Sequence, residues 1–476
     1  MLPNIKATNL LALLLIFSIF LVKYVGTYYL FHNNLSLFVD EAQYWLWSKE
    51  LAFGYYSKPP LIALIIKIFA YFFGDTEVIL KSISNFCVAI TAWFVFKLTC
   101  QLHSKALGIT ALIVFSFMPI TIYGSFFLAT DLPLIMFWSM ALYVLYLALQ
   151  NHNRKYWLLL GVLIGLGILT KYAFVYFYLC LFVYLVIFAR SDFTLSKNNI
   201  LLSLIVTIVV ISPNIYWSIQ NDFITFKHIA NDNIEVNNKL YSPLNSLKFF
   251  TEQIGVFGIL NFYIICLGFY KKLYKEKKQQ FLLCFCLPIF ILVFSQAIIN
   301  NANSNWAALA FVSLSIYTAI IIQILNLGKF FKCSTILNSL TFLIFIFAGD
   351  ISSFFSLSKN PYDKIDGWRQ IANFVRTNHC DKKQIYLFRD RKMAAEMSYY
   401  LQGCYTKIEY YTDEKNIKNY YHMIHPFTKE EDYLYIVSNT NSLLPLNYRQ
   451  VKVASYEVVI SPNKNLQILV KKLAKN

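Results

Sequence analysis

The stretch Asn9–Glu41, NLLALLLIFSIFLVKYVGTYYLFHNNLSLFVDE, contains an apolar run long enough to cross a membrane and ends in two acidic residues. No small-residue cleavage site follows the run, so we expect an uncleaved first span rather than a removed signal peptide. Charge near a bilayer is costly and usually serves a site. Asp40 and Glu41 are therefore the first candidate functional residues, with solvated loop acids as the alternative.

The composition indicates a membrane protein that crosses the bilayer many times. The chain has 476 residues, of which 58% are hydrophobic and only 14% charged. A formal net charge of +17 would suggest nucleic acid in a soluble protein. Here Lys and Arg gather in short loops between apolar runs, where they set orientation and meet anionic lipid headgroups. We therefore expect membrane lipids, and no nucleic acid, as partners.

The hydropathy pattern predicts a polytopic α-helical protein with about 11–13 transmembrane helices. The run Leu61–Phe73 is short and follows two prolines, so it is either a span or a helix in the interface. The eleven runs that qualify are Asn9–Phe31, Leu80–Leu102, Leu107–Gly124, Asp131–Gln150, Tyr156–Leu169, Tyr172–Ala189, Ile200–Ile219, Phe249–Tyr270, Phe281–Ile299, Trp306–Leu325 and Ile336–Phe355.

Loop charge predicts the orientation. With the N-terminus inside, the basic loops at Arg154/Lys155, Arg190/Lys197, Lys271–Lys278 and Lys329/Lys332 all lie on the inner side. Asp40/Glu41, Asp131 and everything after about Phe355 then lie on the outer side. In a bacterium this arrangement is an inner-membrane protein with its acids facing the periplasm.

The chain divides by composition near Phe355. Residues 1–355 form the expected transmembrane domain, with an outer loop at 32–79 that carries the first acids. Residues 356–476 are polar and carry short strand-like runs with helices between them, which predicts a small α/β domain. Its two cysteines, Cys380 and Cys404, are compatible with a disulfide and with two free thiols. No cysteine or histidine spacing indicates zinc.

Two further charged residues have unusual surroundings. Lys58 precedes Pro59 and Pro60, which hold the chain extended and can fix a cation where a phosphate would sit. An ordinary snorkelling lysine is the alternative. Asp131 begins a span with Pro133 in its first turn, which also suits a helix cap.

Six motifs follow one another along the chain: DE at 40–41, YYSKPPL at 55–61, TDLP at 130–133, GLGILTK at 165–171, SPNIYWSIQNDFITF at 212–226 and NSNWAA at 303–308. In order and spacing, these motifs resemble the C superfamily of integral-membrane glycosyltransferases, and within it the branch of lipid A aminoarabinose transferases and protein O-mannosyltransferase-like enzymes. The resemblance covers roughly residues 35–325, with an outer C-terminal domain expected after it.

The resemblance implies an enzyme that transfers a sugar, with inversion, from a polyprenyl-phosphate carrier to lipid A or another envelope acceptor. Asp40 would deprotonate or orient the acceptor, with Glu41 beside it. Asp131 would be a second essential acid. Lys58 and Lys171 would bind the carrier phosphate. These residue types suit the chemistry, because an oxocarbenium-like state needs an aimed acceptor and a stabilised leaving phosphate.

One departure from the family pattern concerns metal. Some aminoarabinose transferases have Glu before the Lys-Pro lysine, whereas this chain has Ser57, so we predict no metal site there. A divalent cation at Asp40 is left open by the resemblance. His32 and His228 are candidate ligands or bases, and polar loop histidines are the simpler interpretation.

Three alternatives remain open. A protein O-mannosyltransferase-like enzyme would need a peptide groove in the outer domain. A lipid-linked sugar transporter or flippase would be expected to show internal repeats and midplane charges, and the sequence shows no repeat. A structural assembly factor would not need this set of acids and a proline-flanked lysine.

Overall fold

The computed structural model describes residues 5–32, 35–151, 153–234, 243–300, 302–357, 361–362, 365–380, 384–414, 416–428, 433–437, 448–461 and 464–475. The chain forms two compact units. The first consists of Met1–Val25, Lys58–Ile62 and Lys81–Phe345. The second consists of Gly26–Ser57, Ala63–Leu80 and Ile346–Asn476, so it joins the first loop to the C-terminal region.

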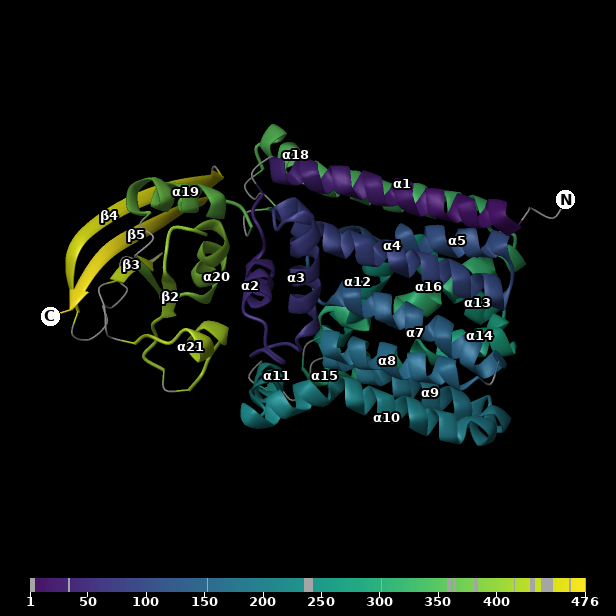
Figure 1. Ribbon diagram of the computed structural model, residues 1–476. Helices are drawn as coiled ribbons and strands as arrows, with labels where there is room; N and C mark the ends of the chain where they lie inside the picture. Colours follow the sequence, from purple (N-terminus) through teal and green to yellow (C-terminus); the bar gives the residue numbers. More distant parts are fainter. Residues whose placement is uncertain are drawn as a thin grey trace. The chain divides into compact units, whose positions relative to one another are not determined.

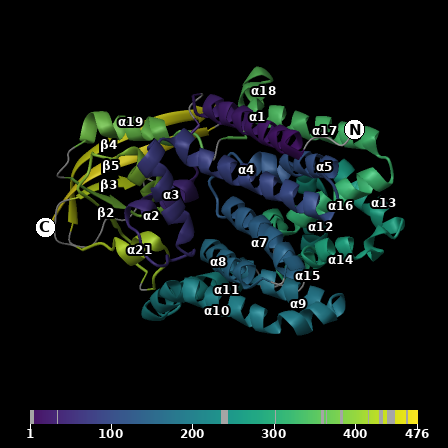
Figure 2. The same cartoon turned by 45° about the vertical axis from the view of Figure 1, so that its right-hand side comes forward.

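The first unit is helical, and Figures 1 and 2 both show α4, α7, α8 and α10 running side by side. Its elements, including α1 and α4 that continue into the second unit, are α1 (Ile5–His32), α4 (Glu77–Leu102), α5 (Lys105–Ser116), α6 (Pro119–Gly124), α7 (Asp131–Asn151), α8 (Arg154–Thr170), η1 (Tyr172–Val175), α9 (Tyr176–Ile187), α10 (Arg190–Gln220), α11 (Ile224–Ile234), α12 (Pro243–Phe257), α13 (Ile259–Tyr270), η2 (Leu273–Lys275), α14 (Lys277–Cys284), α15 (Leu287–Ile299), η3 (Ser304–Ala307), α16 (Ala310–Ile324) and α17 (Gly328–Ile346).

Within the described part of the chain, six helical stretches are long and apolar enough to cross a membrane. A seventh crossing results if the bent pair α12 and α13 counts as one. Most of the remaining expected spans coincide with shorter apolar helices, such as Lys105–Ser116 and Ala310–Ile324. The polytopic helical class predicted from the sequence is confirmed, and the number of crossings stays a prediction.

Several expected spans are interrupted, and one of them bends sharply. The run Phe249–Tyr270, predicted as a continuous helix, is divided into α12 and α13, whose axes differ by 104°. The break lies at Gly258, whose φ of +96° is a conformation that residues with a Cβ rarely adopt. A Cβ there would also approach the Asn338 side chain to 2.9 Å.

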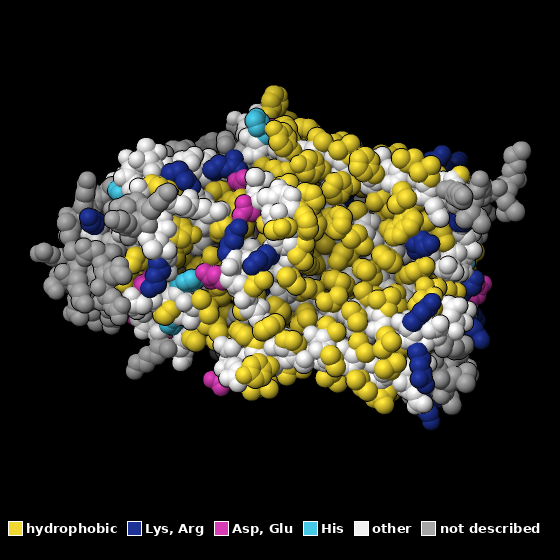
Figure 3. Space-filling model, viewed as in Figure 1, with side chains coloured by type: hydrophobic (Ala, Val, Ile, Leu, Met, Phe, Trp, Pro, Cys, Tyr) yellow, Lys and Arg dark blue, Asp and Glu magenta, His cyan; other side chains and the backbone are white. Residues whose placement is uncertain are grey.

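The surface of the first unit fits a bilayer. Figure 3 shows hydrophobic side chains along the flanks of the helices, while Lys and Arg gather at the end where α1 begins. Exposed apolar residues on these flanks include Phe17, Ile205, Val209, Leu340 and Ile344. An apolar band bounded by a basic end is the pattern of a multi-pass membrane protein.

The second unit contains a five-stranded mixed sheet. The order is β2-β1-β3-β5-β4, with β1 parallel to β2 and β3, and β5 antiparallel to β3 and β4. Figure 1 shows β4 and β5 as a long hairpin. The elements are α2 (Val39–Lys49), α3 (Leu61–Phe73), α18 (Ala348–Phe354), α19 (Trp368–His379), β1 (Ile385–Phe388), α20 (Arg391–Tyr400), β2 (Lys407–Tyr410), α21 (Tyr420–Ile424), β3 (Tyr433–Val437), β4 (Tyr448–Ser461) and β5 (Lys464–Lys475).

The sheet confirms the α/β character expected of the C-terminal region. Buried apolar residues from β1, β3 and β5 form its core, including Leu387, Tyr435 and Leu473. The strand β5 was not expected from the sequence, because its four lysines obscure the alternation.

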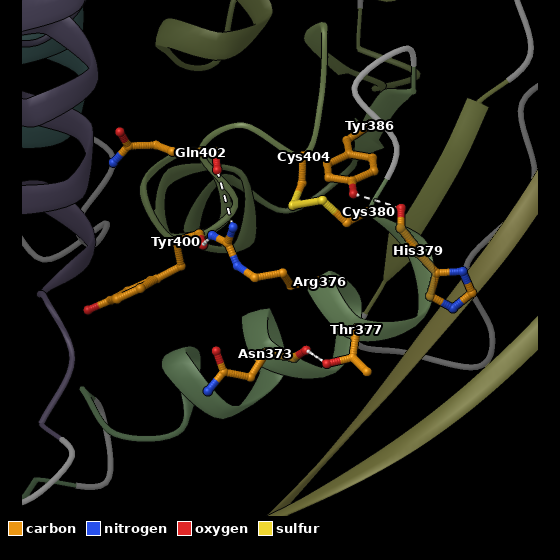
Figure 4. The surroundings of a disulfide bond; sticks show 9 residues. All are labelled: Asn373, Arg376, Thr377, His379, Cys380, Tyr386, Tyr400, Gln402 and Cys404. Carbon is orange, nitrogen blue, oxygen red and sulfur yellow. Dashed lines mark hydrogen bonds between the residues drawn. A yellow bond between two sulfur atoms is a disulfide. The ribbon is translucent and has the colours of Figure 1, made fainter.

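A disulfide joins Cys380 to Cys404, 24 residues apart (Figure 4). It links the end of α19 to the turn before β2. Beside it, the Arg376 guanidinium on α19 donates to the carbonyl oxygen of Tyr400 at 2.6 Å. The bond and this contact together hold α19 against the end of α20.

We predict that Cys404→Ser lowers the free energy of unfolding by about 3 kcal/mol, since the bridge closes a loop of some two dozen residues. Tryptophan fluorescence during heating of the purified protein measures the change. Cys333→Ser is the control, because Cys333 is an exposed free thiol. An unchanged melting temperature for Cys404→Ser would show that the bridge contributes little.

Candidate active site

The centre of the first unit's polar site is an ion pair. Lys171 Nζ lies 2.8 Å from Asp131 Oδ1, and Asn305 Nδ2 donates to Asp131 Oδ2 at 3.0 Å. Both side chains of the ion pair are mostly buried, with 18% of Asp131 and 21% of Lys171 exposed. Each carboxylate oxygen of Asp131 therefore has a donor, and the acid is fixed in position.

Helix ends deliver both members of the pair. Asp131 is the first residue of α7, and Lys171 directly follows the last residue of α8. A helix N-terminus favours an anion and a C-terminus favours a cation, so the backbone stabilises both charges. The 21 residues of α7 measure about 30 Å, the thickness of a bilayer core, and Arg154 and Lys155 follow its far end.

Glycines allow the close packing that places Lys171. A Cβ on Gly161 would lie 2.5 Å from the Ser203 carbonyl oxygen, and one on Gly165 would lie 2.7 Å from Val210. These two glycines, four residues apart, let α8 approach α10 closely. A Cβ on Gly167 would lie 2.2 Å from the ring of buried Phe174, which follows the turn at Lys171.

Lys58 belongs to the same cluster. Its charge acts on Asp131 together with that of Lys171. Two cations therefore lie near one acid at the end of the membrane helices. The structure thus brings together Asp131, Lys58 and Lys171, three residues singled out from the sequence.

Two buried lysines support the chain that leads to Asp131, a role that no sequence motif indicated. Lys81 Nζ donates to the Phe126 carbonyl oxygen at 3.0 Å, and Lys23 Nζ donates to that of Thr121 at 3.1 Å. Ser84 donates to the Phe127 carbonyl oxygen at 2.7 Å. These donors satisfy carbonyls around the end of α6 that would otherwise be costly to bury.

Asp40 lies in the second unit, at the second position of α2. The Arg391 guanidinium on α20 pairs with Asp40 Oδ1 and also donates from Nε to Gln43 Oε1 at 2.9 Å. Asp40 stays partly accessible, with 44% of its side chain exposed. Sequence reasoning did not find Arg391. The available signal is the basic run from Arg389 to Lys392 directly after a buried strand.

Glu41 has a different environment from its neighbour. It is 1% exposed, and its carboxylate accepts a hydrogen bond from the Phe38 backbone N–H at 2.6 Å. This contact satisfies a donor at the start of α2, as a helix-capping acid does. Glu41 therefore fixes the helix that presents Asp40.

Direct contacts, and one contact through Asp75, connect α2 and the residues before it to the C-terminal region. The Leu37 N–H donates to the Tyr400 hydroxyl at 2.8 Å. Trp45 Nε1 donates to Asp75 Oδ2 at 2.9 Å, and the Tyr399 hydroxyl donates to the Asp75 carbonyl oxygen at 2.8 Å. The segment that bears Asp40 is thus built into the fold of residues more than 300 positions away.

Glu50, directly after α2, anchors its other end. It accepts from the Tyr420 hydroxyl at 2.5 Å and lies 3.1 Å from His425 Nε2. Burial by itself would raise the pKa of Glu50, but the hydrogen bonds and the His425 charge outweigh burial and lower it from 4.5. Burial, together with the charge of this carboxylate, raises the pKa of Tyr420.

The two histidines singled out from the sequence, His32 and His228, have the following surroundings. His32 is exposed at the end of α1 and stacks on Tyr28, and His228 lies half-buried on α11. In the described ranges, no three His, Cys, Asp or Glu side chains come close enough to hold a metal ion. The geometry of the described residues therefore does not support a divalent cation at Asp40.

An apolar cavity of about 420 Å³ lies within the first unit between α12, α13, α15 and α16. Phenylalanines dominate its lining, among them Phe250, Phe257, Phe290 and Phe294. The cavity borders the break at Gly258. A space with this lining suits a hydrocarbon chain.

The family model and the curated relative that match this chain both describe glycosyltransferases. Residues 57–217 match the family model described as dolichyl-phosphate-mannose-protein mannosyltransferase. The chain is 28% identical over 314 residues to the lipid A galacturonosyltransferase RgtD of Rhizobium johnstonii. That match spans 65% of this chain and 65% of the relative's length.

Solved structures share the fold. ArnT from Cupriavidus metallidurans, solved in the apo state and bound to undecaprenyl phosphate, superimposes with a TM-score of 0.68 over 96% of this chain and 97% of ArnT. Identity to these structures is 13% and 12%. The Archaeoglobus fulgidus oligosaccharyltransferase gives a TM-score of 0.51 at 12% identity, over 82% of this chain and 64% of that one.

The chain is a multi-pass membrane protein with the fold of ArnT. The resemblance to the C superfamily predicted from the sequence is confirmed by the family model, the curated relative and the fold of ArnT.

We predict that Gly167→Ala destabilises the protein by about 1–3 kcal/mol, because its Cβ would enter the space of the buried Phe174 ring. The displacement would move the adjacent Lys171 and weaken its pairing with Asp131. Gly255→Ala is the control, since a Cβ at that position would have no atom within 4 Å and alanine favours helix. Thermal unfolding measures both. Equal stability of the two variants would contradict the packing argument.

Because the pKa of Glu50 is lowered in the folded protein, we predict that the protein loses stability in acid. Because its folded pKa lies below 4.5, the carboxylate stabilises the fold above the unfolded pKa, and this contribution disappears as the pH falls through the folded pKa. Glu50→Gln should lower the melting temperature at pH 7 and flatten its decline below about pH 4.5. Glu414→Gln, at an exposed surface acid, should leave the profile unchanged. Parallel profiles for wild type and Glu50→Gln would refute the assignment.

Proposed function

We propose that the protein is a glycosyltransferase that transfers a sugar from a polyprenyl-phosphate carrier to lipid A. The observation that carries the proposal is the cluster of Lys58, Lys171 and Asp131 at one end of the membrane helices. Two lysines near a buried acid form a ready site for a phosphate on a lipid. The lipid A galacturonosyltransferase and ArnT bound to undecaprenyl phosphate support the acceptor and the carrier, respectively.

In this proposal Lys58 and Lys171 hold the carrier phosphate. The acceptor oxygen forms a bond to C1 of the sugar while the bond from C1 to the phosphate oxygen breaks, and the phosphate leaves with the electron pair. Attack opposite the leaving phosphate inverts C1. The lysines stabilise charge that grows on the phosphate, which is the largest contribution such a site can make. Asp131 keeps Lys171 in place and helps to position the donor.

Asp40 orients the acceptor, or takes its proton where the acceptor is a hydroxyl. An acceptor phosphate is already ionised and needs orientation more than a base. Glu41 supports Asp40 through the start of α2, where its carboxylate binds the backbone. We keep both acids in the proposed site, with Asp40 as the residue that faces the acceptor.

The orientation is also a proposal. Basic loops follow the ends of the membrane helices opposite Asp131, as at Arg154 and Lys155, which favours an inner location for that end. The Cys380–Cys404 disulfide favours an oxidising compartment for the C-terminal region. We therefore place the site and residues 356–476 on the periplasmic side of a bacterial inner membrane, with residues 1–355 as the transmembrane domain.

The apolar cavity gives the lipid a place to bind. Its phenylalanine lining, between α12, α13, α15 and α16, would accommodate a segment of isoprenoid or acyl chain. A water-soluble sugar nucleotide donor would have no use for such a space.

Asp40→Asn should abolish transfer, with a loss of about 100-fold or more in rate, because an oriented acceptor contributes several kcal/mol to catalysis. Mass spectrometry of lipid A from a deletion strain carrying wild-type or variant genes measures the loss. Asp413→Asn is the matched control, since Asp413 is an exposed acid of the same unit that also pairs with an arginine.

A sugar that is absent from lipid A in the deletion, restored by wild type and by Asp413→Asn, and absent with Asp40→Asn would support the proposal. A sugar lost from protein instead would favour the protein O-mannosyltransferase-like alternative. Full restoration by Asp40→Asn would reject the enzyme and return attention to a lipid-linked sugar transporter.

A further inference from the structure

We propose that Arg391, supplied by the C-terminal region, is the positioning residue for Asp40 and thereby completes the acceptor side of the site. The inference rests on the proposed function and assigns a role to a residue that lies 351 positions from Asp40 in the sequence. It also gives the C-terminal region a direct part in transfer.

The planar guanidinium of Arg391 contacts two side chains of α2. Arg391 Nη2 pairs with Asp40 Oδ1, while Nε donates to Gln43 Oε1 at 2.9 Å. Asp40 and Gln43 are three residues apart and so share one face of α2. A planar fork reaches both acceptors at once, which fixes the rotamer of Asp40. A lysine, with a point charge on a flexible stem, cannot reproduce both contacts.

Rigid elements hold the two ends of this contact. Glu41 fixes the start of α2, and Gln43 is 2% exposed. On the other side, Asp390 caps α20 by accepting from the Met393 N–H at 2.9 Å, so the first residue of α20, Arg391, is held in place. Groups on anchored helices keep the precise geometry that a reactive site needs.

Exposure distinguishes this pair from a purely structural one. Asp40 and Arg391 are 44% and 40% exposed, so the pair adds little to stability. The more buried contacts around α2, such as that of Trp45 with Asp75, already hold the helix. A solvent-facing acid with its orientation fixed by a fork is instead suited to meeting an incoming acceptor.

Arg389 offers a matched control two residues away. It also forms an ion pair with an exposed acid, Asp413, at 2.6 Å, and it belongs to the same unit. Arg389→Gln removes the same charge and the same kind of pair without touching Asp40.

The test measures the rate at which modified lipid A appears after induction of full-length variants in the deletion strain. Arg391→Gln should slow it by about 10- to 100-fold, the effect of a misaligned group, and Arg391→Lys should recover only part of the loss. Arg389→Gln should match wild type. The double variant Asp40→Asn with Arg391→Gln should be no slower than Asp40→Asn alone, because Arg391 acts through Asp40.

Two measurements on purified protein separate positioning from folding. Arg391→Gln should keep the wild-type melting temperature and the wild-type shift of that temperature on adding undecaprenyl phosphate. A wild-type rate for Arg391→Gln, or a lowered melting temperature that accounts for the lost rate, would overturn the inference. If Asp40→Asn slows transfer and Arg391→Gln does not, the inference fails while the proposed function stands. If Asp40→Asn also transfers normally, both fail.

Discussion

A charge that leaves water must be paired, and the rest of this structure depends on that constraint. In the first unit Asp131 is satisfied by Lys171 and Asn305, and buried Lys81 and Lys23 bind backbone carbonyls around the end of α6. Burying ions is repaid only when geometry and hydrogen bonds are good. The helix ends, the glycines of α8 and the turn at Lys171 all serve that geometry. A polar site can therefore exist at the end of an otherwise apolar bundle.

In the second unit, paired charges and hydrogen bonds connect the first loop to the C-terminal region. Residues of the first loop and of the C-terminal region fold as one unit, joined by polar contacts such as Arg369 with Glu77 and Glu50 with Tyr420. The loop that carries Asp40 buries several apolar side chains within this unit, among them Leu37, Trp45 and Trp47. The mixed sheet, the disulfide and α20 supply the framework that orients it. Under the proposed function, the C-terminal region contributes Arg391 beside Asp40.

Much of the fold could be predicted from the sequence. Apolar runs with basic loops indicated a multi-pass helical protein, and strand-like runs after residue 384 indicated the sheet. The breaks were harder, because the bend at Gly258 depends on a backbone conformation that hydropathy does not report. Strand β5 was not predicted, because its lysines interrupt the alternation of apolar and polar residues. Its pairing with β4 stabilises the strand.

Of the candidate site, too, some residues could be predicted from the sequence and others could not. Asp40, Asp131, Lys58 and Lys171 stood out because charge is rare in their apolar surroundings, and the structure joins three of them in one cluster. Arg391 could not be found by that reasoning, since arginine is ordinary in a polar region and its partner is distant in sequence. Lys81 resembled any lysine near the start of a helix, and Lys23 lies inside the first apolar run. Their partners are backbone carbonyls, which no side-chain motif reveals.

We propose that Lys58 and Lys171 hold the carrier phosphate, and a cryo-electron microscopy structure of the full chain with undecaprenyl phosphate tests this most directly. We expect a phosphate whose oxygens lie about 3 Å from the Nζ atoms of Lys58 and Lys171, with Asp131 still beside Lys171. A phosphate bound away from both lysines, with the Asp131 cluster unchanged, would contradict that claim.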